Sequence, residues 1–225
     1  MPIMNVRSLS TIFRDAFRRN RAPAFVLQSF AALLLALYFL VPMVRPVFDI
    51  LSAAKLQYGY LFSGVAGMIF GGLIPWAVIG YRKRIPEGQV FRQFLFYILF
   101  FSGQSMIVDA LYRQQAIWFG EAVDPKTLLL KVLVDQLPFN LLWSTPVSLF
   151  FFTWKDNQFS LADTLRDLRI SGGRRYISIQ LGAWMIWVPA VAMIYSLPLP
   201  LQIPFFNLVL CFFTLVLTFV TRETH

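Results

Sequence analysis

The chain has 225 residues, of which 58% are hydrophobic, 17% aromatic and only 14% charged. A chain this apolar does not fit a soluble globular domain, so the composition indicates an integral membrane protein. The net charge of +9 is split among short segments rather than lining one long face, which argues against nucleic acid as a partner.

Residues 1–23 are predicted to form a basic amphipathic arm. Arg7, Arg14, Arg18 and Arg21 fall on one helical face, and a different face carries the apolar residues Ile3, Val6, Leu9, Phe13 and Phe17. Such a helix suits the surface of a membrane that contains anionic lipid. A mitochondrial presequence has a similar composition, and an arm that only holds the N-terminus inside is the third interpretation.

Residues 24–225 are predicted to form a single transmembrane helical domain, an all-α bundle of four to six spans. Six stretches have about the 20 apolar residues that a bilayer requires: 24–42, 58–80, 91–112, 127–153, 176–197 and 203–221. Residues 45–57 and 155–175 are interpreted as polar connections, the second with a helix start at Ser160 and Asp163.

The second span carries small residues at intervals of four. Ser63, Gly67 and Gly71 form a ridge that lets another helix approach closely, and Pro75 adds local freedom nearby. A packing face is the first interpretation of this ridge, and a glycine-lined conduit is the second.

The third and fourth spans hold the polar residues Gln104, Asp109, Lys131, Asp135, Gln136 and Asn140. A charge deep in hydrocarbon costs a few kcal/mol, so these side chains are expected to face protein or water. Lys131 and Asp135 lie four residues apart, hence on one helix face. If the two spans are neighbours, all of these residues except Asn140 line one vestibule. The alternative is a packing helix with an internal ion pair between Lys131 and Asp135.

Prolines are predicted to bend these helices. Pro138 and Pro146 remove hydrogen bonds to the carbonyls of Val134 and Leu142, and Pro189 does the same in the fifth span. In lipid a freed carbonyl must find a hydroxyl, an amide or water. A polar pocket or ion path could be built from such groups.

Lysine and arginine predict the orientation of the chain. Fifteen of them fall in the N-terminal arm, in alternate connections and in the tail, whereas the other connections hold four. This bias predicts that both termini lie inside and that the number of crossings is even. The bacterial cytoplasmic membrane and the mitochondrial inner membrane fit this pattern.

The inventory of reactive residues argues against catalysis. Cys211 is the single cysteine and His225 the single histidine, so no internal disulfide and no metal site of these residues can form. A hydrolase triad would lack its base. We therefore expect no enzyme activity, no catalytic residues, no metal and no cofactor.

Residues 125–225 resemble a known family. Lys131, Asp135 and Gln136 form a K-x-x-x-D-Q segment ahead of Pro146, and Pro189 and Pro200 repeat a proline spacing of eleven residues. In these features the chain resembles a distant member of the Mpv-seventeen and peroxisomal-membrane-protein-twenty-two family. The resemblance implies a small integral membrane protein of the mitochondrial inner or peroxisomal membrane and, for some members, a weakly selective channel.

The sequence therefore predicts a protein that passes small solutes or ions, with a polar constriction in the fourth span. The alternative is a structural or assembly factor without transport. Lipid is the expected partner in both cases, and a homo-oligomer is left open.

Overall fold

The structure, a computed structural model, describes residues 9–81, 85, 86 and 88–220. These residues are helical with short turns and contain no strand, which confirms the all-α prediction. In chain order the elements are α1 Leu9–Leu40, η1 Pro42–Val44, α2 Arg45–Tyr58, α3 Tyr60–Ala66, η2 Gly67–Leu73, α4 Ile74–Tyr81, α5 Val90–Phe119, α6 Pro125–Val134, η3 Asp135–Ser144, α7 Thr145–Asp156, α8 Leu161–Tyr195 and α9 Leu199–Val220. η1 is a 3-10 turn, whereas η2 and η3 are π-helical.

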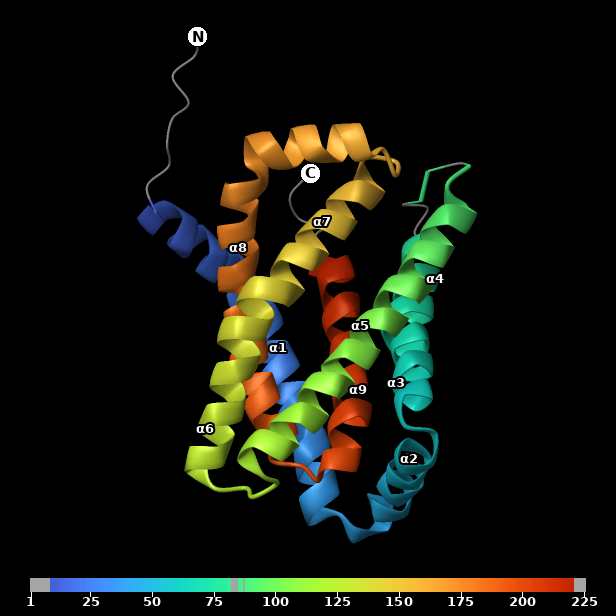
Figure 1. The fold of residues 1–225 in the computed structure, drawn as a ribbon, viewed down its shortest axis with the longest axis vertical. Coiled ribbons are helices and arrows are strands. Elements are labelled where there is room, and N and C mark those ends of the chain that lie inside the picture. Colours follow the sequence, from blue (N-terminus) through green and yellow to red (C-terminus); the bar gives the residue numbers. More distant parts are fainter. Residues whose placement is uncertain (1–8, 82–84, 87, 221–225) are drawn as a thin grey trace.

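Five helical stretches are long and apolar enough to cross a bilayer: Asn20–Leu40, Tyr60–Tyr81, Val90–Phe119, Leu161–Tyr195 and Leu199–Val216. They correspond to five of the six expected spans. The expected span 127–153 forms α6, η3 and α7 instead of one regular helix. Figure 1 shows these three elements running together along the bundle, antiparallel to α5 and to the descending part of α8.

Alternate connections lie at opposite ends of the bundle. The start of α1, the turn between α7 and α8 and the end of α9 lie at the upper end in Figure 1, whereas α2 and the turns after α5 and α8 lie at the lower end. Arg166, Arg169 and Arg174 of α8 therefore share an end with the basic start of α1. This grouping is the one that the charge bias predicts. Which side of a membrane this end faces stays a prediction.

Three boundaries differ from the sequence prediction. The arm and the first span are one helix, α1, which continues through Pro23; residues 1–8 of the arm lie outside the described residues. Residues 45–57 form α2 rather than an irregular linker, and Gly59 ends it with φ +54°. Residues 161–175 belong to α8, whose first part crosses the end of the bundle before the helix bends downward (Figure 1).

The predicted start of α8 is confirmed. The Ser160 hydroxyl accepts a hydrogen bond from the Asp163 backbone N–H at 3.4 Å and donates one to the Asp163 carboxylate at 2.6 Å. At the start of α6, the Asp124 carboxylate accepts hydrogen bonds from the N–H groups of Lys126 and Thr127. The hydrogen bonds from Thr127 and then Lys126 lower the pKa of Asp124, because they favour the charged carboxylate.

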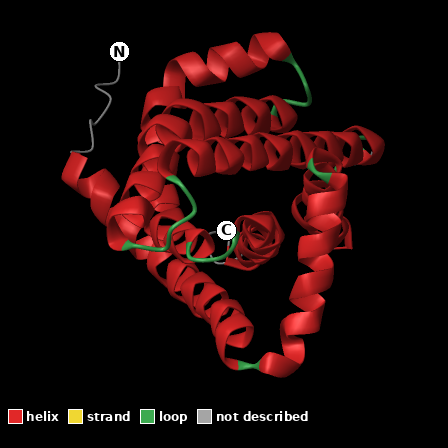
Figure 2. Cartoon of the chain, turned by 60° about the horizontal axis from the view of Figure 1, so that its bottom comes forward, coloured by secondary structure: helices red, strands yellow, loops and turns green. Residues whose placement is uncertain are grey.

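α9 lies in the middle of the bundle. It contacts α1, α2, α5 and α8, and Figure 2 shows the end of the chain at a helix that the others surround. Its buried side chains Ile203, Phe205 and Val209 join the two largest apolar clusters. The remaining elements therefore form a ring that positions the polar groups between neighbouring helices.

The predicted small-residue ridge packs against α5. A Cβ atom on Gly67 would collide with the carbonyl oxygen of Phe101 and the Cβ of Ser105, and one on Gly71 would meet the Phe101 ring at 2.7 Å. Gly72 is equally close to the backbone of α5. The ridge is a packing face and leaves no room for a conduit between η2 and α5. Pro75 is the second residue of α4, directly after the π-helical turn.

Candidate polar core

Asp135 lies at the first position of η3 and is 5% exposed. One carboxylate oxygen accepts a hydrogen bond from Gln136 Nε2 at 2.6 Å, and the other accepts one from the Tyr195 hydroxyl at 2.8 Å. No Lys, Arg or His among the described residues forms an ion pair with it. Asp135 is therefore a buried carboxylate that is held by neutral donors.

The hydrogen bonds continue from Asp135 in both directions. Toward α5, the Tyr195 hydroxyl accepts from Gln115 Nε2 at 2.9 Å. Toward α7, Gln136 Oε1 accepts from Asn140 Nδ2 at 3.2 Å, and Asn140 Oδ1 accepts from the Thr145 hydroxyl at 2.9 Å. Gln180 of α8 also donates to Asn140 Oδ1, at 3.4 Å. We call this set the polar column; its members are Gln115, Asp135, Gln136, Asn140, Thr145, Gln180 and Tyr195.

Both ends of the polar column carry acceptors that have no partner among the described residues. The Oε1 atoms of Gln115 and Gln180 are buried and accept no hydrogen bond in the described part of the chain. The hydroxyl of Tyr112, whose ring contacts that of Tyr195 at 4.8 Å between centroids, is also buried and has no hydrogen-bond partner within the described segments. Buried polar atoms in proteins usually have a hydrogen-bond partner. These atoms can therefore accept a hydrogen bond from a solute.

Lys131 is 2% exposed, yet its ammonium group makes no hydrogen bond and no ion pair with the described residues. It lies 5.8 Å from the centre of the Tyr195 ring, in a cation–π contact. The predicted ion pair between Lys131 and Asp135 is wrong. Although the two residues share a helix face, Asp135 turns to Tyr195 and Gln136 while Lys131 lies over the aromatic ring.

The π-helical turn of η3 explains how side chains of α8 reach the backbone. Pro138 lies inside this turn, and Pro146 is the second residue of α7. Trp184 Nε1 donates to the Gln136 carbonyl at 3.0 Å, and the Tyr176 hydroxyl donates to the Leu141 carbonyl at 2.6 Å. Side chains of α8 therefore satisfy backbone acceptors in η3, as a proline-interrupted helix in lipid requires.

The carbonyls that accept these hydrogen bonds, those of Gln136 and Leu141, are not the two that the prolines in the sequence are expected to leave free. Val134 and Leu142 are the acceptors that a regular α-helix would lose at Pro138 and Pro146. In the π-helical register each amide reaches one residue further back, so the vacant acceptors fall elsewhere. Pro189 lies inside α8, and this helix continues to Tyr195.

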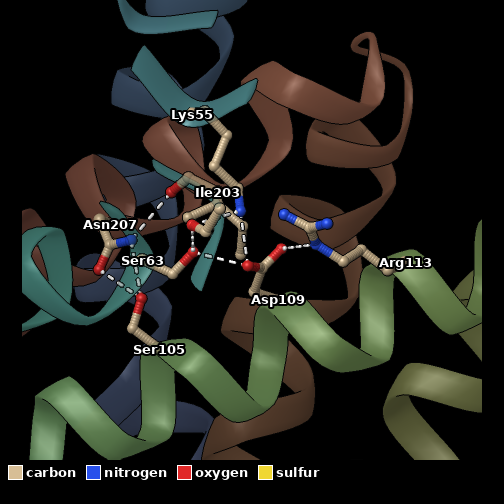
Figure 3. A network of polar contacts seen from close by, with 8 residues as sticks. Lys55, Ser63, Ser105, Asp109, Arg113, Ile203 and Asn207 are labelled. Carbon is tan, nitrogen blue, oxygen red and sulfur yellow. Dashed lines mark hydrogen bonds and ion pairs between the residues drawn. The ribbon is translucent and has the colours of Figure 1, made fainter. Parts of the chain in front are cut away.

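Asp109 belongs to a second cluster, which Figure 3 shows. One of its oxygens accepts hydrogen bonds from Lys55 Nζ at 2.5 Å and from the Ser63 hydroxyl at 2.7 Å. The other accepts from Arg113 Nε at 3.0 Å. Lys55 also donates to the Gly59 carbonyl at 3.0 Å, so this cluster ties α2 and α3 to α5.

A neighbouring pair joins α5 to α9. Asn207 Nδ2 donates to the Ser105 hydroxyl at 3.0 Å and to the Ile203 carbonyl at 3.0 Å, and the Ser105 hydroxyl donates to Asn207 Oδ1 at 3.3 Å. Ser105 and Asn207 are fully buried. Asp109, Ser105 and their partners satisfy one another, which is the signature of a structural cluster.

The predicted vestibule is therefore only partly correct. Asp135, Gln136 and Asn140 lie together, but Asp109 faces α2 and α3, and the half-buried Gln104 makes no side-chain hydrogen bond with the described residues. Asp109 lies five residues from Gln104, so it projects from a different face of α5. The position of Gln104 is explained by the length of α5, which ends at Phe119 instead of near residue 112. Seven further residues shift every depth estimate by about 10 Å. Gln115, on nearly the same face as Gln104, is the residue that reaches the level of Asp135.

Sequence reasoning missed several functional candidates. Gln115 and Tyr195 connect Asp135 to α5, and Gln180 and Trp184 connect η3 to α8. Gln115 and Gln180 are polar residues within apolar helices, the signal that singled out Asp135. Gln115 was missed because the expected third span ends at residue 112, whereas Gln180 lies within the expected span 176–197 and the same signal applies to it directly.

Comparisons of the chain with protein-family models, with curated proteins and with solved structures find no match. The family resemblance that the sequence suggests therefore remains a prediction. Five of the described helices are long and apolar enough to cross a membrane, and this observation supports a broader conclusion. The chain is an integral membrane protein built as an all-α helical bundle.

Proposed function

We propose that the protein passes small ions or solutes across the membrane along the polar column, with Asp135 at the narrowest point. The buried carboxylate of Asp135, held only by neutral donors, is the observation that carries this proposal. Removing a carboxylate from water costs several kcal/mol unless a cation compensates it. An ionisable residue kept under these conditions in a membrane bundle marks a path for ions or solutes by default.

The placement of the column supports the same function. It runs between α5, η3 and α8, and its middle lies on a π-helical turn that contains Pro138. Pi-helical turns are rare and occur often at functional sites. The free acceptors of Gln115 and Gln180 at the two ends are groups with which a hydrated solute can exchange hydrogen bonds.

In this conformation aromatic side chains close the column. Tyr112 and Tyr195 are almost fully buried and pack against each other beside Asp135. Passage of a solute therefore requires these two rings to move. Tyr195 couples such a movement to Asp135, because its hydroxyl donates directly to the carboxylate.

Asp135→Asn is expected to lower the preference for cations over anions about tenfold in planar-bilayer recordings of the purified protein. A tenfold change corresponds to about 1.4 kcal/mol, between the water and protein-surface limits for a unit charge about 4 Å away. Lys131→Met is the matched variant, because it removes the opposite charge one turn earlier, and it should shift the reversal potential the other way. Absence of conductance at every voltage, or an unchanged reversal potential in both variants, contradicts the proposal.

The second candidate is a structural or assembly factor that does not transport. The close packing of Gly67 on α5 and the fully paired Asp109 cluster favour it, because both serve only to hold helices together. On this hypothesis Asp135→Asn changes stability or the recovery of partner proteins and leaves liposome permeability unchanged. Flux and thermal stability measured on the same preparation distinguish the two candidates.

A further inference from the structure

A groove opens on the outside of the bundle where α7 passes the bend of α8. Its volume is ≈ 450 Å³, and apolar side chains form almost all of its lining. Leu142, Leu149 and Phe150 form one wall, and Leu168, Gly172 and Gly173 form the other. The two glycines let the groove extend down to the helix backbone, because neither has a side chain to fill it.

An exposed apolar stripe leads into this groove. Leu161, Leu165, Leu168 and Gly172 follow one another at helical spacing on the first part of α8. Leu161 and Leu165 are 56% and 55% exposed, and this part of α8 crosses the end of the bundle (Figure 1). An amphipathic helix in this position lies in the membrane interface with its apolar side toward the acyl chains.

The same end of the bundle carries a concentration of arginine. Arg166 and Arg169 lie three residues apart on α8, on one face with Gly173 of the groove, and both are exposed. α1 packs along α8, and Asn20 of α1 lies next to Gly182 of α8. Arg18 and Arg21, on either side of Asn20 in the sequence, are exposed and add to this positive charge. Basic residues at a membrane surface each attract anionic lipid by about 1 kcal/mol.

We propose that the groove binds one acyl chain of an anionic phospholipid, whose phosphate lies at Arg166 and Arg169. The dimensions fit this ligand. The groove wall from Leu141 to Phe150 contains ten residues, and the nine steps between them correspond to about 14 Å of helix. That is about the thickness of one leaflet of the roughly 30 Å hydrocarbon core. This site is independent of the polar column, so it holds whether or not the protein conducts.

Binding of lipid to the full-length protein tests the proposal by native mass spectrometry, with phosphatidylglycerol and phosphatidylcholine titrated separately. The wild type is expected to bind one phosphatidylglycerol about tenfold more tightly than phosphatidylcholine. Gly173→Leu fills the groove and should weaken the binding of both lipids about tenfold or more. Gly103→Leu is the matched control: a Cβ on either glycine meets open space, but Gly103 lies on α5 away from the groove.

The headgroup is tested by a second pair of variants. Arg166→Gln combined with Arg169→Gln should weaken phosphatidylglycerol about tenfold and leave phosphatidylcholine unchanged. Lys126→Gln, at the opposite end of the bundle, should change neither. Equal affinity of the wild type for the two lipids, or undiminished phosphatidylglycerol binding by Gly173→Leu, overturns the proposal. So does lipid release that accompanies dimer formation, because a second copy of the chain would then occupy the groove.

Discussion

Replacing Asp109 by asparagine is expected to lower the free energy of unfolding by about 3–5 kcal/mol, the cost of leaving a buried charge without its partner. Asp109 forms an ion pair with Lys55, and the side chains of both residues are buried. Its carboxylate also accepts hydrogen bonds from Arg113 and Ser63. Asparagine keeps the shape of the side chain and removes the negative charge. Lys55 then stays buried against an amide instead of a carboxylate.

The measurement is reversible unfolding in mixed micelles with increasing sodium dodecyl sulfate. Asp135→Asn serves as the matched control, because Asp135 is equally buried but has no cationic partner among the described residues. It should change the free energy of unfolding by no more than about 1 kcal/mol, because the weakened hydrogen bonds are offset by removal of a buried charge that has no cation paired with it in the described part of the chain. Similar losses for the two variants would mean that the Lys55 ion pair contributes little.

A double variant separates charge from packing. Lys55→Met combined with Asp109→Leu removes both charges, and replacement of a buried pair by apolar residues is often neutral or stabilising. Most of the stability lost in Asp109→Asn should therefore return. If the double variant is as unstable as the single one, the cluster acts through the hydrogen bonds of Ser63 and Arg113 rather than through compensation of charge.

The sequence predicted the class of fold because apolar runs of spanning length have few alternatives. It also predicted the burial of Asp135, Gln136 and Asn140, since a polar residue within such a run must turn toward protein. The partners of these residues depend on helix ends, which composition places poorly. The extra seven residues of α5 brought Gln115 to the level of Asp135 in place of Gln104.

Lys55 illustrates a second limit. Residues 45–57 are too short and too polar for a span, so the sequence predicts a connection there and places the charge of Lys55 in a loop. In the structure it lies on α2, which packs on α9 and brings Lys55 to Asp109. A short helix beside the ends of the spans cannot be told from a loop by hydropathy. Only the three-dimensional arrangement of α2, α3 and α5 reveals the ion pair.

Gly67→Ala is expected to destabilise the protein by about 1–3 kcal/mol or more, although alanine is the better helix former. The added methyl group would overlap the Phe101 carbonyl oxygen and the Ser105 side chain, and a carbonyl held in α5 cannot move without shifting that helix. The measurement is again unfolding in mixed micelles.

Gly103→Ala is the control for this variant, since a Cβ there meets nothing within 4 Å. It should stabilise the protein by about 0.5–1 kcal/mol through helix propensity alone. The two substitutions add the same methyl group to helical glycines, so their opposite signs would isolate the effect of contact with α5. If Gly67→Ala instead stabilised the protein as Gly103→Ala does, η2 and α5 would not pack as closely as described. In lipid, where burial of apolar surface gives little drive for helices to associate, such close approach is a main source of their attraction.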